Sequence, residues 1–461
     1  MAVLIFPSHI FPPGAQNMDL EKKDKMSQDL RSIKQPGQFA FFRRHSRDKL
    51  NAFARIRLLL FVAAALIGLA IATIAQSSQP DYPQWYRQNR DDASGAFAEP
   101  KVWPEKLTRR WKVKVGEGYA TPIVVGKTVY SFTRSGANEV MTALNAATGQ
   151  ILWKTAYSAP YKIADVVVKH GAGPKATPLF HNGKLYTIGV TGIVSAFDAT
   201  TGKLVWQKNA PSEHPYLGMG GSPIGDKNLV IVPLDSYGPL IAFDAGTGNV
   251  KWTANGDSAW ISSIIFELGG ARQVVSMTTK TILGVSAADG ALLWQHPWES
   301  MATAGVVTPI ACGETIIVGN QRMGLKAIRP INRDGKWVTD IVWETKEVSI
   351  FLSNPVLISD TLFGLSERAS GRFFALNAKT GKVLWLDQPR GVTNTAVVKA
   401  GDLLFFLSDD AELFVVRSSQ TGFELLKRYT IADSATWAQP AISDNRVFIK
   451  DVTSLAMWTL K

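Results

Sequence analysis

The chain has 461 residues, of which 46% are hydrophobic and 19% charged, and its formal net charge is +12. This content is enough for a large apolar core. The single cysteine, Cys312, excludes an intramolecular disulfide, a CxxCH haem attachment site and a cysteine-based zinc cluster. We expect Cys312 to lie buried in a strand as a small apolar residue.

The first 57 residues are basic and lack a periodic apolar face. They contain eleven Lys and Arg against five Asp and Glu, which is about half of the net charge of the whole chain. We predict that residues 1–57 form a mostly disordered cytoplasmic leader. Residues 58–75 are an uncharged apolar run, close to the length that a helix needs to cross a bilayer core. This run predicts one N-terminal helix, either a transmembrane helix or the core of a signal peptide.

Positive charges gather before the apolar run. The run is preceded by Arg43, Arg44, Arg47, Lys49, Arg55 and Arg57, and the next cation in the chain is Arg87. The positive-inside rule therefore keeps the N-terminus in the cytoplasm. We expect the rest of the chain to be periplasmic or otherwise extracytoplasmic, either anchored in the cytoplasmic membrane or released after cleavage.

Residues 76–106 form a lead-in segment rich in proline and aromatic residues, including Tyr82-Pro83-Gln84-Trp85. We expect this segment to pack on one face of the domain that follows. Residues 107–115 (LTRRWKVKV) then alternate like a β-strand, although no hairpin precedes them.

One hairpin motif recurs through the rest of the chain. It is clearest at residues 196–206 (AFDATTGKLVW), where two alternating strands flank a turn at Gly202. Further copies occupy residues 143–153, 242–252, 284–294 and 375–385, and degenerate copies surround the glycines at 335 and 422. The turn glycines are 41 to 53 residues apart. This period, with strand-like segments between the motifs, is typical of a β-propeller with one four-stranded blade per repeat.

The two ends of the repeat region complement each other. Residues 437–461 supply three strands of a further blade, and residues 107–115 can supply the fourth. Seven internal motifs and this composite blade predict an all-β, eight-bladed propeller over residues 107–461. Strand 107–115 would join strands 437–461 and remove the exposed edges of an open ring. We expect the ring to be monomeric.

One tryptophan recurs on the outer strand of successive repeats. A residue that is repeated once per blade is expected to dock neighbouring blades together, and truncating a buried one should cost about 3 to 5 kcal/mol of stability. The set comprises Trp111, Trp153, Trp206, Trp252, Trp294, Trp343 and Trp385.

The motif A-[FL]-[DN]-A-x-T-G-x-x-x-W resembles the repeat of the PQQ-like (pyrroloquinoline-quinone) β-propeller family. That family includes quinoprotein dehydrogenases and the propeller subunit of the outer-membrane β-barrel assembly machinery. The resemblance covers residues 81–461 and implies the fold, whereas activity differs among members. In the dehydrogenases it implies PQQ and Ca²⁺ held in the axial funnel, with an Asp as base. No Asp, Glu or Asn of this chain matches those ligand motifs, so we assign no catalytic, cofactor-binding or metal-binding residue.

The remaining motifs do not indicate an enzyme. The chain lacks HExxH, GxSxG and Walker A sequences, and residues 170–175 (HGAGPK) precede a strand, which predicts an inter-blade loop. We therefore expect a non-catalytic interaction or assembly scaffold of the cell envelope, without a cofactor. Its partners would be envelope proteins and not nucleic acid. The alternative is a PQQ-dependent dehydrogenase that oxidises an alcohol or a sugar with PQQ and Ca²⁺.

A scaffold would use the amphipathic side chains of its inter-blade loops, because such residues dominate protein interfaces. The residues that we expect to contact a partner are Tyr216, Trp260, Arg390 and Trp437.

Overall fold

The computed structural model describes residues 82–87, 97–210, 217–234, 240–254, 261–278, 280–298, 307–392 and 394–460, all within one compact unit, Ser78–Lys461. The predicted leader (1–57) and apolar helix (58–75) lie outside the described residues. Within the described ranges, no helix combines the length and the apolar character that crossing a membrane requires.

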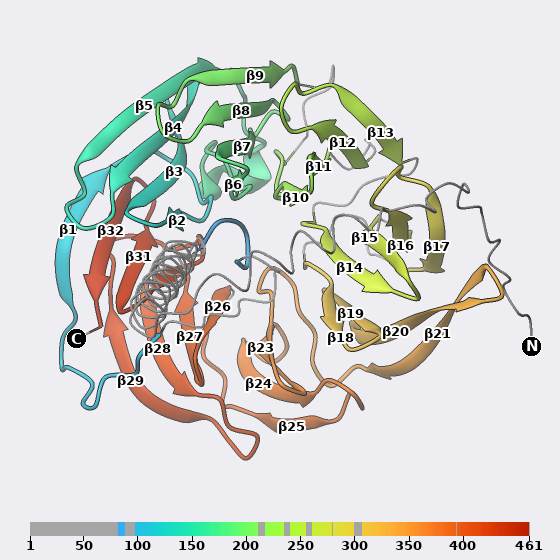
Figure 1. The fold of residues 1–461 in the computed structure, drawn as a ribbon. Helices are drawn as coiled ribbons and strands as arrows, with labels where there is room; N and C mark the ends of the chain where they lie inside the picture. The colour runs from blue at the N-terminus through green and yellow to red at the C-terminus, as the bar shows by residue number, and fades with distance from the viewer. Residues whose placement is uncertain are drawn as a thin grey trace, which may run out of the picture. The chain divides into compact units, whose positions relative to one another are not determined.

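Eight four-stranded antiparallel sheets are arranged in a ring (Figure 1). The prediction of an all-β, eight-bladed propeller is thus confirmed. In each blade the strands are called A to D from the axis outwards.

The first four blades each consist of consecutive strands. Blade 1 contains β2 (Ile123–Val125), β3 (Thr128–Ser135), β4 (Asn138–Asn145) and β5 (Ile151–Ser158). Blade 2 contains β6 (Leu179–His181), β7 (Lys184–Ile188), β8 (Val194–Asp198) and β9 (Leu204–Lys208). Blade 3 contains β10 (Ile224–Asp226), β11 (Leu229–Pro233), β12 (Leu240–Asp244) and β13 (Val250–Ala254). Blade 4 contains β14 (Ile264–Leu268), β15 (Ala271–Met277), β16 (Thr281–Ser286) and β17 (Leu292–Pro297).

Three of the other four blades follow the same plan. Blade 5 contains β18 (Ile310–Cys312), β19 (Thr315–Asn320), β20 (Gly324–Arg333) and β21 (Lys336–Thr345). Blade 6 contains β22 (Val356–Ile358), β23 (Thr361–Ser366), β24 (Arg372–Asn377) and β25 (Val383–Leu386). Blade 7 contains β26 (Thr395–Ala400), β27 (Leu403–Ser408), β28 (Glu412–Arg417) and β29 (Glu424–Thr430). Blade 8 contains β30 (Ala441–Ser443), β31 (Arg446–Lys450), β32 (Ser454–Thr459) and β1 (Thr108–Lys114).

Blade 8 is built from both ends of the propeller. Its outer strand β1 pairs antiparallel with β32, from Thr108 opposite Thr459 to Lys114 opposite Ser454. The backbone N–H groups of Val115 and Gly116 also donate to Thr453 O. Because the first strand of the propeller completes the last sheet, the ring is closed by backbone hydrogen bonds.

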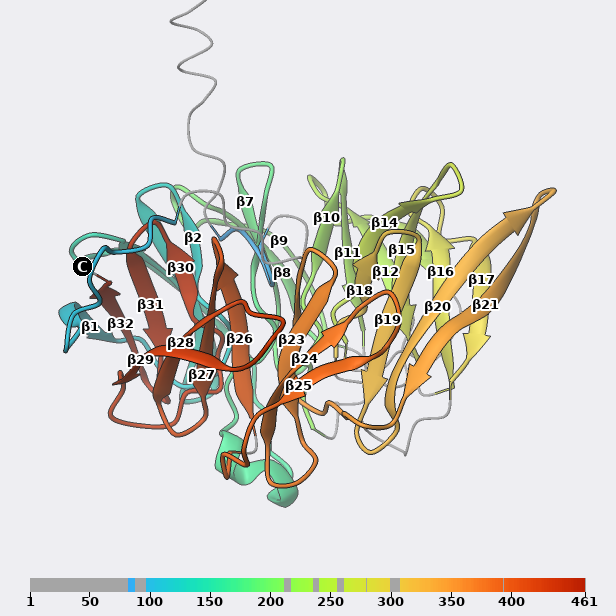
Figure 2. The same cartoon turned by 90° about the horizontal axis from the view of Figure 1, so that it is seen from below.

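The ring has two faces. The connections from strand D to the next strand A and the B–C turns lie on one side, called the loop face. The A–B and C–D turns lie on the other side, called the hairpin face. The 3-10 helix η2 (Asp165–His170) projects from the loop face, and the long β20–β21 hairpin of blade 5 extends past its neighbours on the hairpin face (Figure 2).

The hydrophobic core is divided into layers between adjacent blades. One layer joins Trp343 of blade 5 to Leu362 and Phe374 of blade 6, and it includes Cys312, which is 9% exposed. The prediction that Cys312 is a buried strand residue is confirmed. Each blade therefore depends on its neighbours for burial of both of its faces.

A belt of polar side chains links the blades where the A strands begin. A backbone N–H of one blade donates to a side chain of a neighbouring blade in six described links. These links are Gln439 to Thr121, Thr121 to Thr177, Thr177 to Ser222, Ser222 to Ser262, Thr308 to Asn354 and Thr395 to Ser353, with donor to acceptor distances of 2.9–3.3 Å. Since these residues are buried, the belt satisfies backbone donors that would otherwise lack a partner.

Candidate functional site

The repeated tryptophans lie on the outer strands and face the next blade. In six of the seven, the indole N–H donates to a backbone carbonyl in the C–D turn of that blade. The donors Trp111, Trp153, Trp206, Trp252, Trp343 and Trp385 bond Ala146, Ala199, Ala245, Ala287, Ala378 and Ser419 at 2.8–3.2 Å. The turn glycine lies directly against the ring, since a Cβ on Gly202 would be 2.4 Å from Trp153. The hairpin motif is therefore a device that joins one blade to the next.

Trp294 is the exception to this pattern. Its indole N–H donates to Gln273 Oε1 of its own blade, at 2.6 Å. The next blade carries the lengthened β20–β21 hairpin, and nothing lies within 4 Å of a Cβ placed on its turn residue Gly335. Gly284 occupies the position where most copies of the motif have Ala, and a Cβ there would be 2.3 Å from the Trp294 ring. The Trp294 indole N–H thus bonds within its own blade, while its ring still packs in one core layer with Ile316, Val318 and Ile328 of blade 5.

Two of the four predicted partner-contact residues, Tyr216 and Trp260, lie outside the described residues. Arg390 lies in the connection between blades 6 and 7, and its side chain is 15% exposed. Its guanidinium is paired with Asp387 and lies 4.6 Å from the centroid of the Phe423 ring and 5.4 Å from that of Phe373. Because Arg390 is engaged within the blades, it offers little of its side chain to a partner.

Trp437 lies on the loop face in the connection between blades 7 and 8. Its ring packs edge-on against His170, with the ring centroids 4.3 Å apart, and against Tyr119 at 6.3 Å. Both Trp437 and His170 are partly exposed. The three residues come from three different inter-blade connections, so they form an aromatic cluster that links blades 8, 1 and 2.

The glycine-rich loop at residues 170–175 is an inter-blade loop, as expected. Backbone N–H groups of Tyr119 and Ala120 donate to Pro174 O at 2.8 and 3.0 Å. A Cβ on Gly173 would lie 2.4 Å from the Glu117 carbonyl oxygen. These glycines permit close backbone packing between blades 1 and 2 and do not form the start of a helix that could hold phosphate.

Residues 82–87 (YPQWYR) occupy the axis of the ring and are called the plug. Tyr82 exchanges two backbone hydrogen bonds with Val124 of blade 1, and Phe180 N of blade 2 donates to Pro83 O. Tyr82 and Tyr86 are 0% and 3% exposed. We expected this part of the lead-in segment to pack on one face, but the structure places it between the A strands.

The side chains of the plug extend to further blades. The Trp85 indole N–H donates to Thr308 Oγ1 of the belt at 2.9 Å, and the Tyr82 hydroxyl donates to Gln439 Oε1 at 3.2 Å. The Tyr86 hydroxyl donates to Asn354 O, and Arg87 Nη2 donates to Ile442 O at 2.6 Å. With the backbone bonds of Tyr82 and Pro83, these contacts join the plug to blades 1, 2, 5, 6 and 8. The plug therefore ties together opposite sides of the ring.

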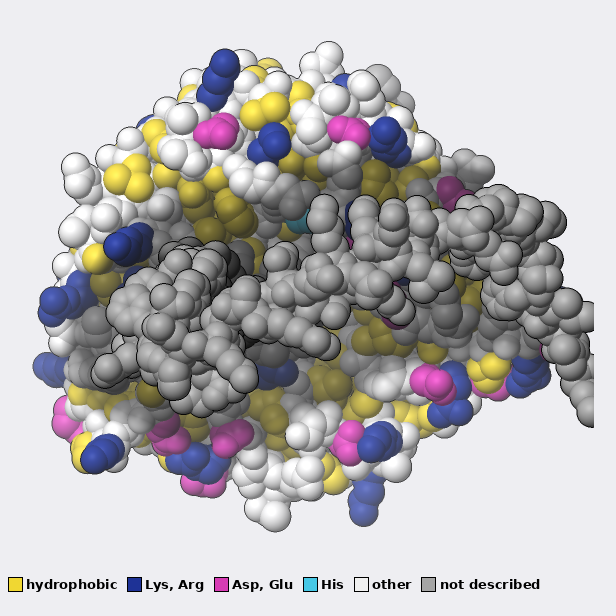
Figure 3. Space-filling view, in the orientation of Figure 1, with side chains coloured by type: hydrophobic (Ala, Val, Ile, Leu, Met, Phe, Trp, Pro, Cys, Tyr) yellow, Lys and Arg dark blue, Asp and Glu magenta, His cyan; other side chains and the backbone are white. Residues whose placement is uncertain are grey.

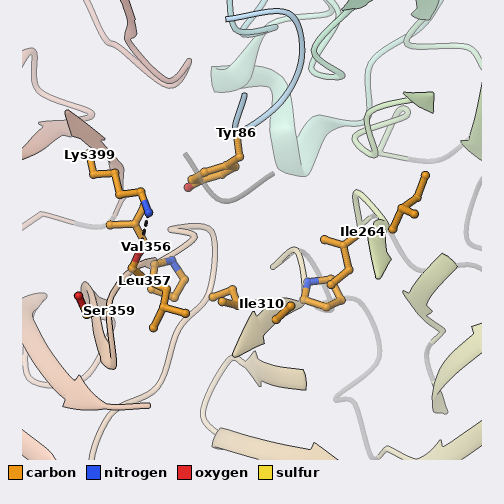
Figure 4. A pocket seen from close by; sticks show the side chains of 11 residues that line it. Tyr86, Ile264, Ile310, Val356, Leu357, Ser359 and Lys399 are labelled. Carbon is orange, nitrogen blue, oxygen red and sulfur yellow. Dashed lines mark hydrogen bonds between the residues drawn. The ribbon is translucent and has the colours of Figure 1, made fainter. Parts of the chain in front are cut away.

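A pocket of about 280 Å³ remains beside the plug (Figure 4). Tyr86 forms one side, and Ile264, Ile310 and Val356 of the A strands line much of the rest. The Lys399 ammonium, which borders the pocket, donates to Leu357 O at 2.7 Å. Both apolar side chains of the A strands and polar groups such as the Lys399 ammonium border this pocket.

Aromatic side chains of the plug fill space between the A strands, and no group of three His, Cys, Asp or Glu residues capable of holding a metal occurs in the described ranges. The polar groups at the belt are mainly hydroxyls and amides that already bond to neighbouring blades.

The face seen in Figure 3 carries charged side chains of both signs. Around its rim, Lys and Arg side chains are interspersed with Asp and Glu side chains. Ion pairs such as Lys326 with Glu344 and Arg272 with Asp226 account for part of this mixture.

Comparison with known proteins places the chain in one family. The family model described as outer membrane protein assembly factor BamB matches residues 100–255 and 190–428. The dehydrogenase subunit of the quinone alcohol dehydrogenase of Acetobacter aceti is 32% identical over 187 residues, which cover 37% of this chain and 24% of that protein. Outer membrane protein assembly factor BamB of Yersinia pestis is 23% identical over 297 residues, 58% of this chain and 70% of that protein.

Solved structures show the same architecture. BamB from Moraxella catarrhalis superposes with a TM-score of 0.56 at 16% identity, covering 77% of this chain and 97% of the other. Quinohemoprotein alcohol dehydrogenase from Comamonas testosteroni superposes with a TM-score of 0.60 at 15% identity, covering 83% of this chain and 80% of the other. The chain spans about a quarter or less of the length of the quinone alcohol dehydrogenase subunits that it matches. On the extent of the family match, the chain belongs to the PQQ-like β-propeller family described as outer membrane protein assembly factor BamB.

Proposed function

We propose that this protein is an exported, non-catalytic scaffold of the cell envelope that binds other envelope proteins through its loop face. The observation that carries the proposal is the plug. The propeller fills its own axis with Tyr82, Trp85 and Tyr86 and hydrogen-bonds them to four blades. A funnel occupied in this way favours a rigid platform over a chamber for a cofactor.

The loop face supplies suitable contact groups. The aromatic cluster of Tyr119, His170 and Trp437 is partly exposed and is held by three connections. Rigid aromatic side chains contribute much binding energy at little entropic cost. A preorganised cluster of this kind suits a protein-binding surface.

Crosslinking in the intact envelope tests the scaffold. Trp437→Ala, Tyr216→Ala and Trp260→Ala should each be compared with the parent chain for recovery of crosslinked partners. Each hot spot typically contributes about 2 kcal/mol or more, so recovery should fall sharply for at least one variant. Leu152→Ala is the control, because Leu152 is 51% exposed on the outer strand of blade 1, away from the loop connections. Unchanged recovery in all three variants would contradict this use of the loop face.

The second candidate is a PQQ-dependent dehydrogenase, favoured by the alignments with quinone alcohol dehydrogenase subunits. Purification with added PQQ and Ca²⁺ separates the two candidates. A scaffold should retain no quinone after gel filtration and should show no oxidation of alcohols or sugars with an artificial acceptor. Stoichiometric PQQ together with acceptor-linked oxidation would establish the dehydrogenase instead.

A further inference from the structure

A groove of about 500 Å³ lies between blades 4 and 5 at the loop face. It lies at the one described junction where the repeated tryptophan does not bond to the next blade. The Trp294 indole N–H bonds within blade 4 instead of to blade 5, although its ring packs with Ile316, Val318 and Ile328 of blade 5. His296 and Trp298 border the groove from blade 4, and Leu325, Lys326 and Ile341 border it from blade 5.

One residue that borders the groove has a buried donor for which the described residues provide no acceptor. Trp298 is 6% exposed, and its indole N–H has no hydrogen-bond partner among the described residues. The Lys326 ammonium lies 5.8 Å from the centroid of the Trp298 ring and is paired with Glu344 at 2.7 Å. A buried donor of this kind costs about 1 to 3 kcal/mol relative to a bonded one, so an acceptor supplied by a ligand would be stabilising.

The charges bordering the groove favour an anion. Lys326 and Glu344 offset each other, whereas Lys346 is exposed and forms no ion pair with a described residue. His296 Nδ1 shares a hydrogen bond with Thr339 Oγ1. Burial of the imidazole lowers its pKa, and the nearby charge of Lys326 lowers it further. With that histidine neutral at pH 7, the groove carries one excess positive charge.

The remaining surface of the groove is apolar and partly exposed. Met323 and Ile341 are 37% and 50% exposed, and Leu325, which also borders the groove, is 2% exposed. A volume of about 500 Å³ falls within the range of sites for small molecules. We propose that this groove binds a small, free aliphatic carboxylate, with its charged group near Trp298 and Lys346 and its alkyl chain against Met323, Leu325 and Ile341. This site is independent of the proposed scaffold function.

Binding of hexanoate to the full-length protein tests the proposal, measured by saturation-transfer NMR and titration calorimetry. Hexanoate should bind at least tenfold more tightly than 1-hexanol or hexylammonium, because only the carboxylate both accepts from the indole and attracts Lys346. Trp298→Phe keeps an aromatic ring but removes the N–H, and should weaken binding about fivefold. Lys346→Gln should weaken it severalfold and reduce its dependence on salt.

Lys336→Gln is the matched control, because Lys336 is exposed at the far end of the same strand, β21. It should bind hexanoate like the parent chain. Lys346→Gln changes only an exposed side chain, so the test remains valid if Trp298→Phe does not fold. Equal affinity for hexanoate and hexylammonium, or unchanged affinity in both variants, would overturn the proposal. The proposal would also be overturned if hexanoate does not bind while the protein binds phosphatidylglycerol vesicles through Lys346. The same holds if hexanoate does not bind while a crosslinked protein is recovered only when Lys346 is present.

Discussion

At the scale of single residues, the blade junctions depend on pairs of residues that are far apart in sequence. Trp252 in blade 3 bonds the Ala287 carbonyl in blade 4, and its ring lies against Gly290 of the same turn. A change on either side of the junction therefore disturbs the other. A hydrogen bond of this type contributes about 1 kcal/mol, and the buried ring adds considerably more.

Gly284 offers the sharpest test of such a pair. In Gly284→Ala the new Cβ would lie 2.3 Å from the Trp294 ring. Overpacking should lower the free energy of unfolding by about 1 to 3 kcal/mol, as measured by chemical denaturation. Gly422→Ala is the control, since nothing lies within 4 Å of its Cβ. The double change Gly284→Ala with Trp294→Phe should recover part of the loss. A fully stable Gly284→Ala protein would show that Trp294 does not hold this position.

Lys450 gives the protein a defined dependence on pH. It is 1% exposed, its ammonium donates to the Asp451 and Val452 carbonyls, and burial lowers its pKa from 10.5 to about 8. Between these pH values the unfolded chain binds more protons than the folded chain, so this lysine makes the protein more stable as the pH rises.

Lys450→Met should remove that dependence. Between pH 7.5 and 9.5 the parent chain should gain roughly 2 kcal/mol of unfolding free energy relative to the variant. Chemical denaturation at both pH values measures the difference. Lys106→Met at an exposed position is the control and should follow the parent. An identical pH profile for Lys450→Met and the parent would mean that Lys450 is not held as the structure shows.

At the scale of elements, the plug acts as a brace across the ring. It joins blades on opposite sides through bonds from Tyr82, Trp85, Tyr86 and Arg87. Neighbouring blades are already joined by the tryptophans and the belt, but those links run only around the circumference. The plug is the described segment that connects blades across the axis, and its loss should loosen the ring without unfolding individual sheets.

Arg87→Met tests this brace. Arg87 is 5% exposed, and its guanidinium donates to Ile442 O of blade 8. Loss of this charged hydrogen bond should destabilise the protein by about 2 kcal/mol. Limited proteolysis should cut residues 76–97 faster than in the parent. Arg110→Met at an exposed position on β1 serves as the control. Equal rates of proteolysis in Arg87→Met and Arg110→Met would show that the Arg87 bond does not hold the plug in place across the ring.

The repeat made most of the elements predictable from sequence. The hairpin motif locates strands C and D, and the surplus strand at residues 107–115 matches the deficit at residues 437–461. The plug was harder to predict because Tyr82-Pro83-Gln84-Trp85 occurs once and carries no periodicity. The belt does have a signal in the short polar residue before a proline, as at Thr121-Pro122 and Thr177-Pro178. Its role became clear only when neighbouring blades were placed side by side.

Neither the groove nor the burial of Arg390 between blades 6 and 7 could be inferred from single motifs. The insertion around Gly335 marks an irregular blade in the sequence. The hydrogen bond that Trp294 makes depends on where the lengthened β20–β21 hairpin places its turn relative to blade 4. That placement is a property of the tertiary structure. Arg390 has the composition of a contact residue, yet three phenylalanines from two blades surround it. Side chains in inter-blade connections can serve packing or partners, and sequence alone does not separate these uses.

At the scale of the whole molecule, the closed ring makes the protein a single cooperative unit. The outer strand of blade 8 comes from the start of the propeller, so every blade except blade 8 is continuous in the chain. A cell that exports this protein must therefore deliver residues 107–460 to the same compartment before blade 8 can form. We expect the N-terminal 75 residues to determine the side of the membrane on which this happens.

We predict that the propeller lies outside the cytoplasm. The cations before residues 58–75 should hold the N-terminus inside, because the positive-inside rule counts the Lys and Arg that flank an apolar segment. Alkaline phosphatase, which is active only after export, should therefore be active when fused after Lys461. As a matched variant, Arg55 and Arg57 can be changed to Gln together with Arg43, Arg44, Arg47 and Lys49, which should lower the exported fraction. A stable but inactive phosphatase fusion to the parent chain would reverse the topology. N-terminal sequencing of the exported protein then distinguishes an uncleaved anchor, which retains residues 58–75, from a signal peptide that has been removed.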